Sequence, residues 1–241
     1  MAKVVCAGLT DVGQKRDHNE DAMAVRPELG MLAVADGMGG AASGEVASKI
    51  YIDCAIEVFS DTAYEDLSVE EMVQKVFALA HQTILDNARN NEVHKGMGCT
   101  AELLAFDGDY YVLGHVGDSR TYLYRDGTLK QLTKDHSIVQ DQIDRGLLKP
   151  EDARTHSLRN VIVRAVGVEE SFAIDMVRNA CQKDDIFLLC SDGLTDMLKD
   201  DEITQVILAS GDLAGKAEGL IRSANEAGGK DNITVVLCQI V

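Results

Sequence analysis

Residues 31–40 have the sequence Met31-Leu32-Ala33-Val34-Ala35-Asp36-Gly37-Met38-Gly39-Gly40. The first five residues are apolar, as in a strand that is buried within a domain. The aspartate and the glycines that follow are residues that favour turns. A buried strand that ends in this way would place a carboxylate at one rim of a sheet, so the stretch predicts an acidic group beside a hydrophobic core.

Four other aspartates occur in comparable surroundings. Asp118 and Asp192 also follow hydrophobic runs, whereas Asp231 precedes the run at 233–237. An antiparallel strand that begins at the same rim would bring Asp231 to the others. Each aspartate taken alone is most simply a turn residue. Their conjunction predicts one site, built from Asp21, Asp36, Asp118, Asp192 and Asp231.

Several carboxylates in one place repel one another and lose hydration, so a fold keeps them together only when they are solvated, protonated or neutralised by cations. Hard divalent ions supply that neutralisation. A site with only oxygen ligands favours magnesium, manganese or calcium over zinc, which prefers His and Cys. Gly37 fits such a site, because its missing side chain lets its own carbonyl or a phosphate come close.

Four sequence blocks, taken together and in this order, are specific for one family. They are Val34-Ala35-Asp36-Gly37-Met38-Gly39-Gly40, Gly117-Asp118-Ser119-Arg120, Ser191-Asp192-Gly193-Leu194 and Lys230-Asp231-Asn232-Ile233-Thr234. From about Gly8 to the C-terminus, the chain resembles the metal-dependent serine/threonine protein phosphatases of type 2C, the PPM family, in their short bacterial form. The resemblance implies an α+β fold, a four-layer α-β-β-α sandwich of two antiparallel sheets flanked by helices.

The resemblance also implies a cofactor, namely two divalent metal ions, Mn²⁺ or Mg²⁺. It makes Asp36 the carboxylate that bridges both ions. Asp192 and Asp231 would complete one ion, and the carbonyl of Gly37 would serve the other. Asp118 matches the residue that is associated with a third, weaker ion in bacterial members.

Three residues near the N-terminus complete the implied site. Glu20 and Asp21 would lie close to the ions and act largely through metal-bound waters, and Arg16 matches the phosphate-binding arginine of the family. A planar guanidinium can take two phosphate oxygens and offset the charge that builds up in transfer. Two ions lower the pKa of a shared water, and the resulting hydroxide would hydrolyse phosphoserine or phosphothreonine directly, without a phosphoenzyme.

The general acid for the leaving group stays open. Many bacterial relatives have His directly after the Asp-Gly-Met-Gly-Gly block, where this chain has Ala41, and eukaryotic members have His where this chain has Met38. Either a metal-bound water protonates the leaving group, or a histidine from elsewhere, such as His18, moves in. His115 and His136 are expected to satisfy local hydrogen bonds.

Other phosphatase chemistries find no matching motif. A cysteine nucleophile needs Cys-x5-Arg, and none of the 6 Cys has Arg at that offset. Residues 107–111 lack the pattern of an aspartyl-phosphate enzyme and are expected to form a hairpin turn. A catalytically silent metal- or partner-binding module of the same fold is the alternative from another class. It predicts the loss of a ligand, and every matched position is intact.

Length and charge limit the number of domains and the partners. At 241 residues, with 2 Pro and no visible linker, the chain is expected to be a single catalytic domain, 1–241. Residues at about 137–158 resemble the family's flap beside the active site, with an ordinary surface helix and loop as the other interpretation.

The net charge of -17 argues against nucleic acid and anionic membranes as partners. The expected partners are phosphorylated proteins and a Ser/Thr kinase, and the chain is expected to be a monomer.

The N-terminus has no signal-peptide pattern and no apolar run approaches membrane-spanning length, so a cytoplasmic protein is expected. The 6 Cys are dispersed without metal-ligand spacing and are expected to be reduced, mostly in the core.

Hydrophobic periodicity and turn residues predict separate groups of strands and helices. The expected strands lie at 4–10, 22–26, 31–35, 99–106, 110–116, 121–124, 184–191 and 232–240. The expected helices lie at 43–59, behind the capping box Ser68-Val69-Glu70-Glu71, and around 201–209 and 213–227. Segregated strands and helices favour an α+β layered domain over alternating parallel units.

Overall fold

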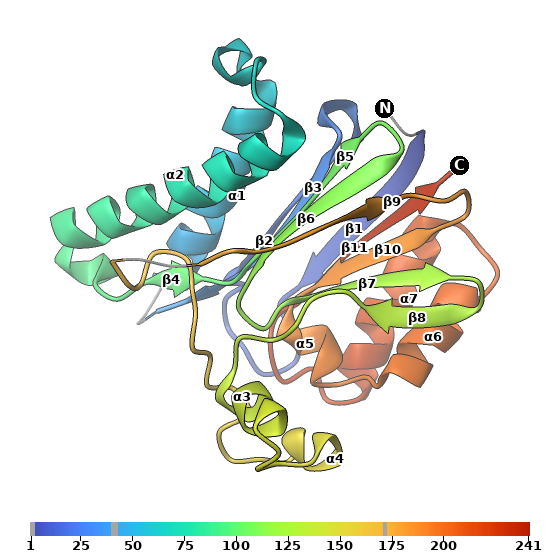
Figure 1. Ribbon diagram of the computed structural model, residues 1–241. Helices are drawn as coiled ribbons and strands as arrows, with labels where there is room; N and C mark the ends of the chain where they lie inside the picture. The colour runs from blue at the N-terminus through green and yellow to red at the C-terminus, as the bar shows by residue number, and fades with distance from the viewer. Residues whose placement is uncertain (1–2, 40–42, 171–172) are drawn as a thin grey trace.

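The computed structural model describes residues 3–39, 43–170 and 173–241. Two antiparallel sheets lie face to face, and helices cover the outer face of each sheet (Figure 1). This arrangement confirms the four-layer α-β-β-α sandwich that the sequence predicts.

The five-stranded sheet contains the first and the last strand of the chain. Its strands, in spatial order, are β1 (Val4–Asp11), β11 (Ile233–Ile240), β10 (Ile186–Cys190), β7 (Arg120–Arg125) and β8 (Thr128–Gln131). The short helix α5 (Asp192–Thr195) follows β10 directly, and two longer helices, α6 (Asp200–Leu208) and α7 (Leu213–Glu226), pack on the outer face. The antiparallel placement of β11 between β1 and β10 means that the start of β11 meets the end of β10.

The six-stranded sheet faces it. Its path runs through β2 (Asp21–Arg26), β3 (Met31–Met38), β5 (Ala101–Asp107), β6 (Tyr110–Val116) and β9 (Asp175–Ala180), and β4 (Gly98–Cys99) pairs with the end of β3. Helices α1 (Gly44–Ser60) and α2 (Val69–Asn90) cover its outer face. None of the helices in the described ranges is both long and apolar enough to cross a bilayer.

Strand β3 shows why the apolar run at 31–35 is continuous. Leu32 and Val34 face the other sheet and pack in the layer between the two sheets. Met31, Ala33 and Ala35 point to the opposite side and pack under α1 and α2. Because successive side chains alternate between the two faces and both faces are covered, every residue of the run must be apolar. Burying one such Leu or Val side chain contributes about 1.5–3 kcal/mol.

The predicted elements are present with shifted ends, and the sequence missed two strands. The capping box is confirmed, since the Glu71 backbone N–H donates to Ser68 Oγ at 3.3 Å and the Ser68 N–H donates to Glu71 Oε2 at 2.8 Å. Strands β8 and β9 were not predicted as separate strands, because each is short, largely polar and at a sheet edge. The flap segment, residues 137–158, contains two short helices, α3 (Ile138–Asp144) and α4 (Pro150–Ala153).

The cysteines are free thiols, as expected, and mostly lie in the core. Cys54, Cys99, Cys190 and Cys238 are buried, whereas Cys6 and Cys181 are half-buried. The Sγ atoms of Cys6 and Cys238 lie 3.1 Å apart across β1 and β11.

A buried polar contact joins the two sheets. Glu102 on β5 contacts His115 Nδ1 on β6 and accepts a hydrogen bond from Thr121 Oγ1 on β7, which belongs to the opposite sheet. All three side chains are buried. Burial raises the pKa of Glu102, although His115 opposes this shift. Burial lowers the pKa of His115, but Glu102, the Lys134 carbonyl and Asp135 together outweigh burial, so that the pKa is raised.

We expect Glu102→Leu to lower the free energy of unfolding by about 3–5 kcal/mol, because it leaves the buried His115 and Thr121 without their partner. Glu102→Gln keeps one oxygen and puts an NH2 group in the place of the other, and it should lower this free energy by about 1 kcal/mol. Urea unfolding of the three proteins measures both differences. A Glu102→Leu protein as stable as the native chain would show that the contact is dispensable to the fold.

Candidate active site

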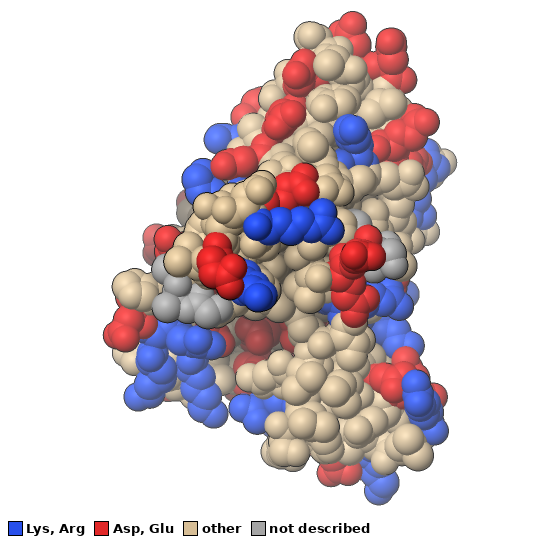
Figure 2. Space-filling view, turned by 90° about the vertical axis from the view of Figure 1, so that its left-hand side faces the viewer, with Lys and Arg blue, Asp and Glu red and all other residues tan. Residues whose placement is uncertain are grey.

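A cleft of about 260 Å³ opens where strand ends of the two sheets meet. The residues that line it are Arg16, Glu20, Asp36, Gly37, Met38, Gly39, Thr100, Asp118, Asn160, Ile162, Asp192, Asp231 and Asn232. The molecular face in Figure 2 is hollowed, with acidic side chains in the depth of the hollow and Lys and Arg side chains beside it. The net charge of -17 is therefore not a uniformly acidic surface.

The topology explains how distant aspartates meet. Asp36 lies near the end of β3, and Asp118 lies in the turn between β6 and β7. Asp192 follows the end of β10 after one residue, Ser191, and starts α5, and Asp231 lies two residues before β11. Because β10 and β11 are antiparallel neighbours, the last two carboxylates reach the same rim, as the sequence predicted.

Asp21 takes a different position from the other four. It starts β2, directly opposite Asp36 in the register of β2 and β3, but its side chain does not line the cleft. Ser191 Oγ donates a hydrogen bond to Asp21 Oδ2 at 2.7 Å. Glu20 does line the cleft, so of the two neighbouring acids Glu20 is the more accessible to a ligand there.

The carboxyl groups at this rim resist ionising together. Burial, followed by the charges of neighbouring aspartates, raises the pKa of Asp36 and of Asp192 well above the ordinary value. Burial also raises the pKa of Asp21 to about 6, and burial with the charge of Asp135 raises that of Asp118 to about 7. A cation in the cleft would offset both the lost hydration and the mutual repulsion.

The residues present suit hard divalent ions. Asp21 Oδ1 and Asp192 Oδ1 are buried without a hydrogen-bond partner among the described residues, which leaves two oxygens to be satisfied by another group. The acidic side chains at the cleft offer only oxygen donors, as Mg²⁺, Mn²⁺ and Ca²⁺ prefer.

Two of the acidic side chains at the rim already have partners within the chain. In the described ranges, no three His, Cys, Asp or Glu side chains form a group that could already hold an ion. Part of the reason is that other groups occupy their oxygens: Arg16 Nη2 lies 2.6 Å from Asp231 Oδ2, and Ser191 holds Asp21. When a cation binds, Asp231 would exchange the guanidinium of Arg16 for that cation. The partner of its carboxylate would be positively charged in both cases.

The local packing requires a glycine at position 37. A Cβ atom at Gly37 would lie 2.0 Å from the carbonyl oxygen of Gly44, the first residue of α1. A Cβ atom at Gly44 would in turn lie 2.7 Å from Glu20 Oε1. The missing side chains therefore let the end of β3, the start of α1 and Glu20 approach one another, in addition to the access for a ligand that the sequence suggested.

Asn232 holds the loop that carries Arg16. Its Oδ1 accepts a hydrogen bond from the Glu20 N–H at 2.8 Å, and its Nδ2 donates to the carbonyls of Val12 at 3.0 Å and His18 at 2.8 Å. Asn232 belongs to the block Lys230-Asp231-Asn232-Ile233-Thr234, but its role could not be predicted from the sequence. The side-chain amide of Asn232 thus ties the segment that carries Asp231 to the segment that carries Arg16.

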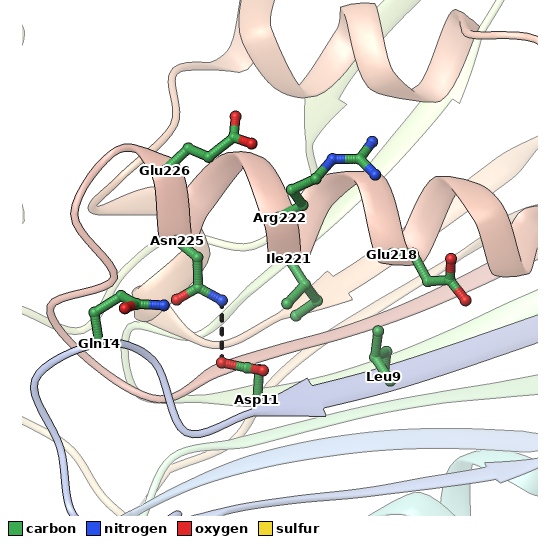
Figure 3. A pocket seen from close by; sticks show the side chains of 8 residues that line it. All are labelled: Leu9, Asp11, Gln14, Glu218, Ile221, Arg222, Asn225 and Glu226. Atoms are coloured by element: carbon green, nitrogen blue, oxygen red, sulfur yellow. Dashed lines mark hydrogen bonds between the residues drawn. The ribbon is translucent and has the colours of Figure 1, made fainter.

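A larger groove, of about 570 Å³, lies between β1 and α7 (Figure 3). Asn225 Nδ2 donates to Asp11 Oδ1 at 3.0 Å, as the dashed line marks, and the same oxygen accepts from the Gly13 N–H at 2.8 Å. The Gln14 N–H donates to the Gly229 carbonyl at 2.7 Å. The groove gathers no cluster of carboxylates, and its contacts serve to anchor the beginning of the Arg16 loop.

The six histidines lie outside the wall of the cleft among the described residues. Met38 lines it, as the comparison of motifs anticipated, and no described residue in its wall is a histidine. Ala41 lies outside the described residues, and His18 is exposed on the Arg16 loop. His115 and His136 are buried and hydrogen-bonded, as expected. Thr100, Asn160 and Ile162, which sequence reasoning missed, complete the wall.

The fold and the cleft define a class of protein, an α-β-β-α sandwich with an acidic cation site between its sheets. A family model described as protein phosphatase 2C matches residues 13–237, and the chain belongs to this family. Protein phosphatase PhpP of Streptococcus pneumoniae is 37% identical over 233 residues, which cover 95% of this chain and 94% of that protein.

Solved structures agree with the family. The crystal structure of the Mycobacterium tuberculosis serine/threonine phosphatase PstP/Ppp matches with a TM-score of 0.90 and 36% identity, covering 98% of both chains. The catalytic domain of PstP in complex with two manganese ions matches with a TM-score of 0.86 and 34% identity, covering 99% of this chain and 98% of that chain.

The metal-free protein should lose stability as the pH rises from about 4, the pKa of an unfolded aspartate, to about 7. The pKa values of Asp21 and Asp118, about 6 and about 7, lie above that of an unfolded aspartate, so the folded state binds protons that the unfolded state does not. The free energy of unfolding then falls as these groups ionise. Asp118→Asn removes one of the charges and should raise the melting temperature at pH 8 by about 2–4 °C, the shift given by about 1 kcal/mol in a chain of this size.

Calorimetry in the presence of a chelator measures this shift. Asp53→Asn, the same change at an exposed carboxylate on α1, is the matched control and should leave the pH dependence unaltered. A metal-free protein whose stability rises with pH over this range would contradict the crowding of unpaired carboxylates.

Proposed function

We propose that this chain is a metal-dependent protein phosphatase that hydrolyses phosphoserine and phosphothreonine in proteins. The observation that carries the proposal is the convergence of Asp36, Asp118, Asp192 and Asp231 on one cleft that also contains Arg16. Carboxylates without cations would repel a phosphate, whereas carboxylates with cations attract it. Family membership and the names of the relatives support the same reaction. A catalytically silent module gains no support, because every matched acidic position is present.

Two divalent ions, Mn²⁺ or Mg²⁺, are the proposed cofactors, as in the PstP structure with two manganese ions. Asp36 would bridge them, Asp192 and Asp231 would complete one ion, and the Gly37 carbonyl would serve the other. Asp21 and Glu20 would support this set through water, and Asp118 would hold a third, weaker ion. When bound, the ions neutralise the carboxylates and activate a water for direct attack on phosphorus.

Arg16 would bind and orient the phosphate. Its side chain is half exposed at the cleft and lies 2.6 Å from Asp231, whose carboxylate raises the pKa of the guanidinium. A cation that binds Asp231 in place of Arg16 would leave the planar guanidinium of Arg16 available for two phosphate oxygens. The same residue would therefore compensate Asp231 in the metal-free protein and hold the substrate in the loaded one.

We propose a monomeric cytoplasmic enzyme that acts opposite a Ser/Thr kinase, in one catalytic domain with the flap segment beside the cleft. The position of Asn160 and Ile162 in the cleft wall, directly after the flap segment, supports a role for that segment in shaping the substrate site. The interspersed basic side chains in Figure 2 support local recognition of an anionic group on an otherwise acidic protein.

Release of phosphate from a phosphothreonine peptide tests the reaction. We expect turnover with Mn²⁺ or Mg²⁺, none with a chelator, and a loss of at least about 100-fold in kcat/KM in Asp192→Asn, because a ligand to the ions is lost. Asp53→Asn is the control and should match the native rate. No turnover with any metal, while calorimetry shows that the ions bind, would favour the silent module.

Arg16→Lys should lower kcat/KM by about tenfold or more, because an ammonium keeps the charge but loses the paired N–H groups that fit a phosphate. Arg89→Lys on the exposed side of α2 is the matched control. Steady-state kinetics over a range of Mn²⁺ concentrations separate two roles. If excess Mn²⁺ restores the native rate, Arg16 acts only on Asp231, and the phosphate contact is refuted.

A further inference from the structure

His136 lies where the five-stranded sheet leads into the flap segment. The residue follows β8 and precedes Ser137, the N-cap of α3, and only 6% of it is exposed. Its ring stacks at 4.6 Å on that of His115. It does not line the cleft, so it is not a group that contacts substrate.

His136 makes a reciprocal pair of hydrogen bonds with Gly117. The His136 N–H donates to the Gly117 carbonyl at 2.7 Å, and the Gly117 N–H donates to His136 Nδ1 at 3.1 Å. Since Nδ1 accepts, the ring proton of the neutral form is on Nε2, which lies 3.2 Å from Asp175 Oδ2 and 3.1 Å from Arg164 Nη1. The ring is thereby held in one orientation by groups on both of its sides.

Gly117 connects His136 to the acidic cleft. It adopts a φ of +113° and precedes Asp118. A Cβ atom there would lie 2.6 Å from Thr100, so the turn packs tightly on Thr100. Thr100 Oγ1 accepts a hydrogen bond from the Asp36 N–H at 2.9 Å and pairs with Ser119 Oγ at 2.6 Å. A chain of direct contacts thus leads from His136 to the backbones that carry Asp118 and Asp36.

The backbone of His136 also holds the return of the chain from the flap segment. The Val163 N–H donates to the His136 carbonyl at 2.7 Å, and the Ile138 N–H donates to the Val161 carbonyl at 2.9 Å. Between them, Ile162 pairs with Ser137 and places its side chain in the cleft wall. The entry to the flap segment and the cleft wall are therefore one hydrogen-bonded unit.

We infer that His136 is a positioning residue, which locks the turn before Asp118 to the base of the flap segment through the acceptor Nδ1. The inference rests on the proposed function for its kinetic consequence. The physical reason is that Asp118 lies in a turn rather than in a strand, so no sheet ladder fixes it. The hydrogen bond from the Gly117 N–H to His136 Nδ1 supplies the missing restraint. The positions of the flap segment and of the proposed weaker ion site at Asp118 would then depend on each other.

Two isosteric replacements separate this role from mere packing. In His136→Asn, Oδ1 occupies the place of Nδ1 and can accept from Gly117, whereas in His136→Gln the amide reaches the place of Nε2 and leaves the Gly117 N–H without its acceptor. We expect the Mn²⁺ concentration for half-maximal hydrolysis of a phosphothreonine peptide to rise about tenfold in His136→Gln and to stay within about twofold in His136→Asn.

Amide hydrogen exchange of the metal-free proteins gives a readout that does not depend on activity. The peptide that contains Gly117 should exchange faster in His136→Gln than in the native chain and in His136→Asn. Equal Mn²⁺ dependence and equal exchange in all three proteins would overturn the inference, as would equal impairment of both variants in proportion to a lowered melting temperature. An inactive native protein would count against the proposed function, while the exchange of Gly117 would still test the restraint.

Discussion

Carboxylates crowd at one end of the two sheets, and the fold has to be stable in spite of their repulsion. Asp36 and Asp192 come from opposite sheets, and burial together with neighbouring charges raises the pKa of both. Such a cluster opposes folding of the metal-free chain, since charges are brought together and lose water. The three apolar layers of the sandwich must outweigh this opposition, and only strand ends from two facing sheets bring so many acids to one rim.

Partners within the chain relieve part of this crowding. Arg16 neutralises Asp231, and Ser191 donates to Asp21. Each of these is a single side-chain contact that another partner can replace, whereas the segment that carries Arg16 is held by Asn232 and by the hydrogen bond from Gln14 to Gly229. The cleft therefore combines a rigid frame with side chains that can exchange partners, as a site that binds and releases ions requires.

The sequence predicted those features that depend on local pattern. The apolar run before Asp36 indicated a doubly covered strand, and Ser68 with Glu71 indicated the start of α2. Strand β9 escaped prediction because its exposed, polar residues are a strand only through pairing with β6. The partners of His136 and the place of Ile162 in the cleft wall also escaped, since they depend on how the chain returns from the flap segment.

The acidic residues of the cleft differ in how their positions are fixed. Asp36 belongs to β3, which is hydrogen-bonded to strands on both sides, and Asp192 follows a buried strand and opens a helix. Asp118 lies in a turn whose restraint comes from side chains, chiefly His136 and Thr100. Ligands on regular elements are held more precisely than ligands on loops. A cation near Asp118 would consequently be bound more weakly than one near Asp36. Cation binding near Asp118 would depend on the flap segment, whereas cation binding near Asp36 and Asp192 would not.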